Sequence, residues 1–171
     1  YTIIDEIGSG TIQFIQIEKG IQVLFLEATY HQPMLFKWNF TDKKNTNYYL
    51  GQHFVLGNSS KGNPKANKET VVEDGISLFT EDCFRRRLWL PNVKHKSVLI
   101  KFSKEWLKHV WQLFQIPDSA KANLNTSADL NLLVKKSTEL QFAFNNLQNV
   151  HNNFTGKLKM PYFKIKTIEI V

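Results

Sequence analysis

The sequence predicts an α+β fold in which an antiparallel β-sandwich or barrel comes first and helices come last. Up to Phe102, apolar and polar residues alternate over short runs that turn residues separate. From Ser103 onward, apolar residues recur at helical spacing instead. The length of 171 residues fits one compact unit. We therefore expect a β-sandwich over residues 1–102 and a helical segment over residues 103–171.

Eight short β-rich runs make up the first segment. Lys19-Gly20 fits a tight hairpin turn between the first two runs, and Glu73–Gly75 is a strong turn signal further on. Short strands at nearly regular spacing with turns between them favour an antiparallel sandwich or barrel. The runs cover residues 11–18, 21–30, 34–40, 48–56, 69–72, 76–80, 84–90 and 95–102.

A helix is predicted directly after the last strand. The Ser103 hydroxyl can accept a hydrogen bond from a free amide of the first turn, and Glu105 suits the positive end of the helix dipole. One broad apolar stripe follows, and Pro117 enforces the stop. The stripe consists of Trp106, Leu107, Val110, Trp111 and Phe114.

A longer helix is predicted from a cap at Thr126 or Ser127 onward. Apolar residues there recur at alternating spacings of three and four, which suits a packed helix or the seam of a dimer. Both interpretations stay open on the pattern alone. As a dimer interface, the seam would consist of Leu133, Leu140, Phe144 and Leu147.

The tail from Phe154 to Val171 supports two structures. Its β-branched, partly alternating end favours a strand by propensity. A helix requires Pro161 in the first turn, where proline is tolerated.

The tail also carries a family resemblance. Phe154–Lys159, followed by Tyr162, Lys166 and Glu169, resembles a segment of AraC-type transcription regulators, in which a Thr-Gly pair opens a helix with Tyr, Lys and an acidic residue. Pro161 departs from the family's usual pattern. Upstream segments that look like the family's strands, turn and final strand–helix step are His53–Gly57, Glu73–Leu78, Pro91, His95 and Val98–Leu107.

The resemblance implies a cupin-like sandwich that binds a small-molecule effector, with helices that form a homodimer or dock to a DNA-binding domain. That domain would follow Val171, so DNA would be contacted only through it. No catalytic residue, metal site or cofactor is predicted from the sequence. A single cysteine, Cys83, agrees with a reducing cytoplasm. No apolar run approaches the roughly 20 residues that span a bilayer.

Four residues are candidates for the ligand-binding pocket. Arg87 and Trp89 share one strand face, where an inward Arg beside a Trp would make a stackable site that tolerates anions. His53 shares its face with Tyr49 and could also point inward. Trp38 could line the pocket, or like Trp89 could belong to the core.

Two other functions fit the sequence less well. A cupin-fold metal enzyme would need a His-x-His pair and further ligands, whereas the five histidines are isolated in the sequence. A carbohydrate-binding sandwich would display Trp38 or Trp89 on an exposed face, and would rarely need the helical third of the chain. The net charge of +7 is spread along the chain and does not predict a nucleic-acid site.

Overall fold

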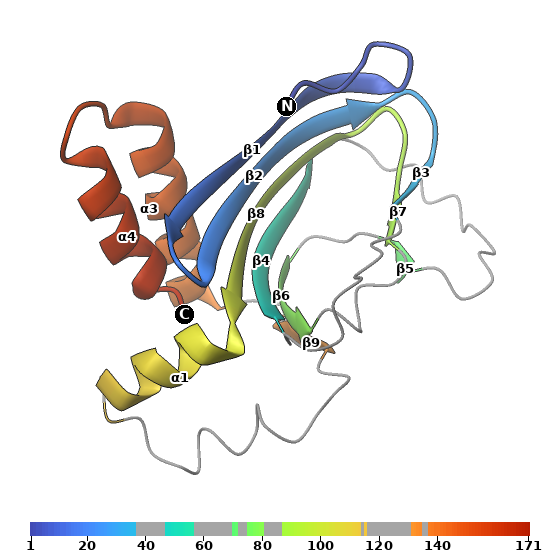
Figure 1. Cartoon of the computed structure of the whole chain (residues 1–171). Helices are drawn as coiled ribbons and strands as arrows, with labels where there is room; N and C mark the ends of the chain where they lie inside the picture. The colour runs from blue at the N-terminus through green and yellow to red at the C-terminus, as the bar shows by residue number, and fades with distance from the viewer. Residues whose placement is uncertain are drawn as a thin grey trace.

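The computed structural model describes residues 1–36, 47–56, 70–71, 75–80, 87–113, 115, 131–134 and 137–171. Within them, nine strands and three helices follow the predicted α+β order. A curved sheet is covered on one side by α3 and α4, with α1 at its lower end (Figure 1). The prediction of a mainly antiparallel sheet followed by helices is confirmed.

The large sheet has the strand order β1-β2-β8-β4-β6-β9, and every neighbouring pair is antiparallel. A small sheet has the order β3-β7-β5, in which β5 runs parallel to β7. Its parallel pair is the one departure from the antiparallel prediction among the described strands. The strands of the large sheet are β1 (Gly8–Glu18), β2 (Ile21–Tyr30), β8 (Lys94–Ser103), β4 (Asn47–Leu56), β6 (Gly75–Thr80) and β9 (Asn131–Val134). Those of the small sheet are β3 (Met34–Phe36), β7 (Arg87–Trp89) and β5 (Thr70–Val71).

The large sheet has two distinct faces because side chains alternate along each strand. On β2, Ile21 and Val23 belong to one buried cluster, which also includes residues of all three helices. We call this the helix face. Leu26, Ala28 and Tyr30 of the same strand point the other way and pack with Trp89 of β7. We call this the inner face. Strand β2 therefore contributes side chains to two separate cores.

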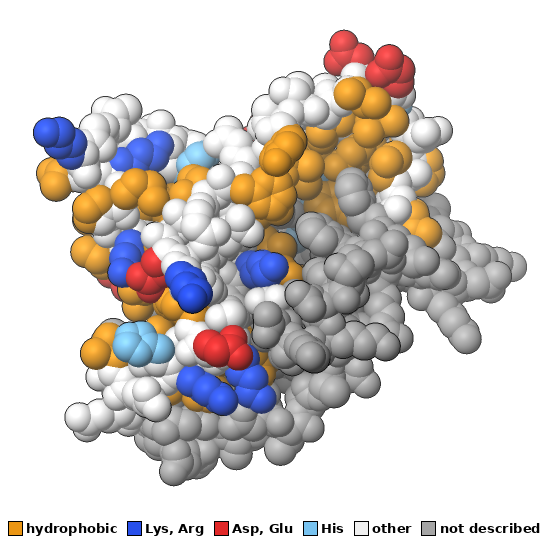
Figure 2. All heavy atoms as spheres, in the orientation of Figure 1, with side chains coloured by type: hydrophobic (Ala, Val, Ile, Leu, Met, Phe, Trp, Pro, Cys, Tyr) orange, Lys and Arg blue, Asp and Glu red, His pale blue; other side chains and the backbone are white. Residues whose placement is uncertain are grey.

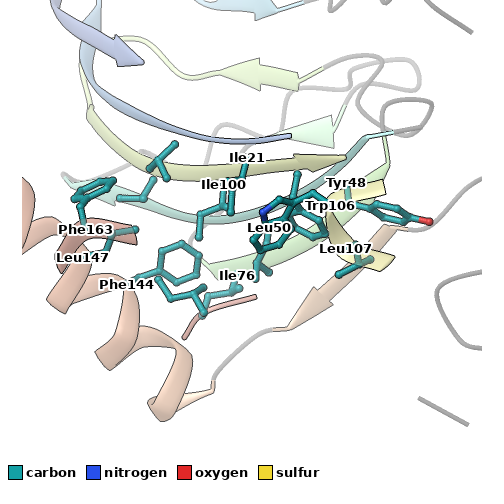
Figure 3. Packing of buried hydrophobic residues seen from close by; sticks show 14 of the residues in the cluster. Ile21, Tyr48, Leu50, Ile76, Ile100, Trp106, Leu107, Phe144, Leu147 and Phe163 are labelled. Atoms are coloured by element: carbon teal, nitrogen blue, oxygen red, sulfur yellow. The ribbon is translucent and has the colours of Figure 1, made fainter. Parts of the chain in front are cut away.

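The helix face holds the main hydrophobic core. Figure 3 shows strand residues such as Ile21, Ile100 and Leu50 above Phe144 and Leu147, with Phe163 beside them. Phe144, Leu147 and Phe163 all have 0% exposure. Trp106 and Leu107 close the core at the end of the sheet (Figure 3). Burying large side chains of this kind contributes about 1.5–3 kcal/mol each.

Helix α1 (Lys104–Leu113) begins at the predicted cap. The amide of Trp106 donates to Ser103 Oγ at 3.1 Å, which confirms Ser103 as the N-cap residue. Trp106 and Leu107, from the predicted apolar stripe, are buried. Phe114 and Pro117 lie outside the described residues.

The long helix begins later than predicted. Helix α3 spans Thr138–Asn153, and Ser137 caps it by accepting from the amide of Leu140 at 3.2 Å. The predicted helical course through residues 131–134 is wrong, because β9 pairs there with β6. Without β9, the outer backbone groups of β6 would be left as an open sheet edge. The segment after residue 102 thus contributes a strand as well as helices.

The tail forms a helix, which settles the ambiguity between helix and strand. Helix α4 spans Lys159–Ile168, with Pro161 in its first turn. Phe163 and Thr167 are buried on one side of α4, at a spacing that only a helix brings together. Burial of this face overrides the β propensity of the sequence.

Glu18, at the end of β1, ties two helices to the sheet. Its carboxylate accepts a hydrogen bond from Trp106 Nε1 of α1 at 2.7 Å and forms an ion pair with Lys164 of α4. The hydrogen bond from Lys164, and to a smaller extent the one from Trp106, holds the pKa of Glu18 below its ordinary value. One carboxylate therefore links β1, α1 and α4.

The hairpin turn next to Glu18 is pressed against the start of α1. The predicted turn at Lys19-Gly20 is confirmed, and Gly20 has a φ of +89°. The amide of Ser103 donates to the Gly20 carbonyl oxygen at 2.8 Å. The junction between the last strand and the first helix is thus held by the turn of β1 and β2.

Lys and Arg side chains are dispersed over the face seen in Figure 2 rather than gathered into one basic patch. None of the helices in the described ranges combines the length and the apolar character needed to cross a membrane.

Candidate ligand-binding site

The inner face brings two histidines and a serine together. In the register of β4 and β8, His53 lies opposite Ser97 and Val55 lies opposite His95. Opposite residues on neighbouring strands share a face, so these polar side chains project to the same side. Their side is the inner face, away from the helices.

Hydrogen bonds join the three side chains to one another and to the backbone. His53 Nδ1 bonds to Ser97 Oγ, and His53 Nε2 lies 3.3 Å from His95 Nδ1. His95 Nε2 lies 2.9 Å from the carbonyl oxygen of Leu90. A carbonyl oxygen can only accept, so His95 carries a proton on Nε2. The lone pair of neutral His95 is then on Nδ1, facing His53.

Two aromatic rings flank the histidine pair. The Trp89 ring lies 4.8 Å from the ring of His53, at an interplanar angle of 86°. Its centroid is also 4.8 Å from that of His95, at 61°. Tyr30 packs edge-on to Trp89 at 6.0 Å and lies 6.1 Å from His95. Together these rings form a compact aromatic cluster that is largely buried, with Tyr30 1% and Trp89 7% exposed.

Burial keeps two members of this site uncharged at neutral pH. His95 has no exposed surface, and desolvation lowers its pKa below 6.5, against the opposing effect of its bond to Leu90. Burial raises the pKa of Tyr30 to about 12. At neutral pH, these two side chains therefore offer hydrogen bonds and ring surfaces but no net charge.

Two of the four predicted pocket residues come together. His53 and Trp89 are in ring contact on the inner face. Arg87 lies on β7 opposite Phe36, and its side chain is outside the described part of the structure. Trp38 is outside the described residues altogether.

His95, Ser97 and Tyr30 were missed as site residues. The period-two alternation of β2 and β8 places them on a common face, but only the strand register shows which polar residue of β4 they meet. Histidines that are isolated in the sequence are therefore adjacent in space. The sequence shows the alternation along each strand. It does not show the strand pairing that brings these residues together.

The four predicted seam residues have different positions. Phe144 and Leu147 have 0% exposure within the chain, so they have no surface left for a second copy. They form the intrachain core instead of the predicted seam. Leu140 packs partly against the same core, and Leu133 lies on β9 opposite Ser77.

A hollow lies on the helix face between strands β1 and β2 and the end of α3. Its volume is about 130 Å³, and its lining includes Gln13, Gln148 and His151. The His151 ring stacks on Phe25 at 4.0 Å and 7°. Burial, and then the charge of Lys159, lowers the pKa of His151.

No group of three or more His, Cys, Asp or Glu side chains that could hold a metal ion occurs among the described residues. Comparisons with protein-family models, with curated proteins and with solved structures find no match for this chain. The function is therefore inferred from the two faces of the sheet and from the residues of the inner face.

Proposed function

We propose that this chain is the effector-sensing and dimerisation domain of an AraC-type transcription regulator, with a cupin-like sandwich. The observation that carries the proposal is that the two faces of one sheet hold different features. The inner face gathers His53, Trp89 and His95, whereas the helix face carries α3 and α4. A helix at the tail, where the family resemblance is strongest, adds support.

In this proposal, a small molecule binds on the inner face and acts on the helices across the sheet. An effector shifts a conformational equilibrium only if it binds one state better than the other. A DNA-binding domain after Val171 would then be placed differently in the two states. We place the protein in the cytoplasm, because Cys83 is its only cysteine.

Effector binding can be tested by thermal unfolding. A panel of sugars, aromatic carboxylates and other small metabolites is screened for compounds that raise the melting temperature. A compound bound on the inner face should stabilise the wild type and Trp111→Leu, whose altered side chain packs against the core of the helix face. It should not stabilise Trp89→Leu. An equal shift in Trp89→Leu would contradict the inner face as the binding site.

Dimerisation is proposed through exposed apolar residues of the α3–α4 region. Phe142 is 66% exposed, Leu158 76% and Ile165 53%. Contiguous exposed apolar patches mark interaction surfaces, and we propose that these side chains belong to one. The proposed occupant is a second copy of the chain, as in the predicted homodimer.

Sedimentation tests this surface. Leu158→Glu should weaken association, because it places a charge in an apolar contact. Lys157→Glu, at the neighbouring exposed position, is the matched control and should leave association intact. A wild-type chain that stays monomeric, or a Leu158→Glu dimer as strong as the wild type, would contradict the proposal.

No specific observation favours the two alternative functions. A carbohydrate-binding platform needs an exposed aromatic ring, whereas Trp89 is 7% exposed. A cupin-fold enzyme would need a set of catalytic side chains, and we propose no catalytic role for His53 and His95.

A further inference from the structure

We propose that His53 and His95 together bind a divalent transition-metal ion such as Zn²⁺, through His53 Nε2 and His95 Nδ1. This inference does not rest on the proposed regulatory function, since such a site could serve any protein with this inner face. It begins from two imidazole nitrogens that face each other at 3.3 Å.

The tautomer of His95 makes its facing nitrogen a ligand. Because Nε2 donates to the Leu90 carbonyl oxygen, the free lone pair is on Nδ1. Transition-metal ions bind the neutral form of imidazole.

The facing nitrogen of His53 becomes a ligand after one proton shift. Without an ion, His53 Nε2–H can donate to His95 Nδ1 while Ser97 Oγ donates to His53 Nδ1. With an ion, the ring proton moves from Nε2 to Nδ1, and Ser97 Oγ becomes the acceptor. No proton is gained or lost overall, because the serine hydroxyl can act in either role.

The spacing of the pair agrees with tetrahedral coordination. Zinc–nitrogen distances of about 2.0–2.1 Å and a tetrahedral angle place two ligand nitrogens about 3.3 Å apart. The observed separation is 3.3 Å. The ring centroids are 5.5 Å apart, so the two nitrogens point almost straight at each other, as in a hydrogen bond. His53 is only partly buried, and its ring would turn and shift to let both lone pairs meet at one ion.

Both histidines also have the outer hydrogen bonds that metal ligands require. A ligating imidazole usually bonds through its second nitrogen to a carbonyl, carboxylate or water, which fixes its tautomer and orientation. Leu90 provides a carbonyl oxygen for His95, and Ser97 provides a hydroxyl for His53. Neither the Leu90 carbonyl oxygen nor the Ser97 hydroxyl would itself be a ligand of the metal ion.

The ion would keep open coordination positions. No third His, Cys, Asp or Glu joins the pair within the described ranges, so water or a small oxygen donor would complete the shell. Neither imidazole carries a negative charge to offset that of the ion. An anionic donor on the open positions would therefore strengthen binding.

The test uses tag-free protein, stripped with EDTA and dialysed, at near-neutral pH. Zn²⁺ alone is titrated by calorimetry, and Co²⁺ alone by visible absorption. One ion per chain with tetrahedral-type Co²⁺ bands is expected for the wild type. His53→Ala is the main variant, because His53 is partly exposed, whereas His95 is fully buried and its loss would threaten folding.

Matched variants make the result decisive. His53→Ala, with its fold checked by circular dichroism, should lose the ion. Ser97→Ala should keep the stoichiometry and bind roughly 10–100-fold more weakly. His109→Ala removes an exposed histidine of α1 and should bind as the wild type does. A wild type without bound ion, or equal uptake by folded His53→Ala, would overturn the proposal.

Discussion

Gly20 offers a sharp test of how the sheet is joined to the helices. A Cβ at this position would lie 2.8 Å from Ser103 Oγ and 3.0 Å from Trp106 Cβ. The backbone also has a φ of +89°, in the left-handed region that L side chains rarely adopt. Gly20→Ala therefore combines backbone strain with a steric clash at the start of α1.

The two effects can be estimated separately. A left-handed backbone costs a non-glycine residue about 1–2 kcal/mol. Overpacking by one methyl group costs about 1–3 kcal/mol. Gly20→Ala should thus lower the free energy of unfolding by about 2–5 kcal/mol, a large part of the stability of an ordinary domain.

Gly156 provides the matched control. Its φ of +80° is similar, but a Cβ there would meet nothing within 4 Å. Gly156→Ala should therefore show the backbone cost alone, about 1–2 kcal/mol. The difference between the two variants isolates the clash with α1.

Urea unfolding followed by tryptophan fluorescence and far-ultraviolet circular dichroism measures both variants. The expected difference in the free energy of unfolding is about 1–3 kcal/mol. Equal losses in the two variants would refute tight packing of the hairpin turn against α1. The junction would then be looser than the contacts at Gly20 indicate.

Three further predictions concern the core, the Glu18 link and the cap. Phe144→Ala should cost about 3–5 kcal/mol in urea unfolding, whereas Asn149→Ala, at an exposed position of the same helix, should change stability by less than about 0.5 kcal/mol; similar losses would contradict the intrachain core. Because the folded pKa of Glu18 lies below its ordinary value of 4.5, its stabilisation is complete above that pH and is lost as the pH falls through the folded pKa. Glu18→Gln should remove about 0.5–1 kcal/mol at neutral pH, and acid titration of stability should show a smaller fall below pH 4.5 than in the wild type; parallel curves would exclude the link. Ser103→Ala should cost about 1 kcal/mol through loss of the cap of α1, and an unchanged urea midpoint would show that the cap is not needed.

The strands were predictable because their signals are local. Alternation and turn residues placed the β1–β2 hairpin, β4, β6 and β8 close to their observed bounds. The cap at Ser103 was predictable for the same reason, since it depends on three neighbouring residues. The sequence did not decide between helix and strand for the tail, because its β-branched residues and Pro161 disfavour a helix. In the structure, burial of Phe163 and Thr167 on one side of α4 favours the helix.

The parts that sequence reasoning missed depend on pairing between distant segments. The run Asn131–Val134 is too short to show a period, and it becomes a strand by pairing with β6. The contact of His53 with His95 likewise depends on the register of β4 against β8. A register shift of one residue would move His53 to the helix face. Residue types and spacing alone do not determine that choice.

Strand β8 provides a physical connection for the proposed coupling, because it carries residues of both faces. His95 and Ser97 form part of the site on the inner face, while Val98 and Ile100 are fully buried on the helix face. Because alternate residues of one strand are rigidly connected, a ligand that moves His95 must also move the surface against which α3 and α4 pack. The same strand continues without a loop into α1, through the cap at Ser103. If the proposed coupling exists, a change on the inner face should reach α1 along β8 and α4 through the core. Glu18 contacts both helices, through Trp106 of α1 and Lys164 of α4.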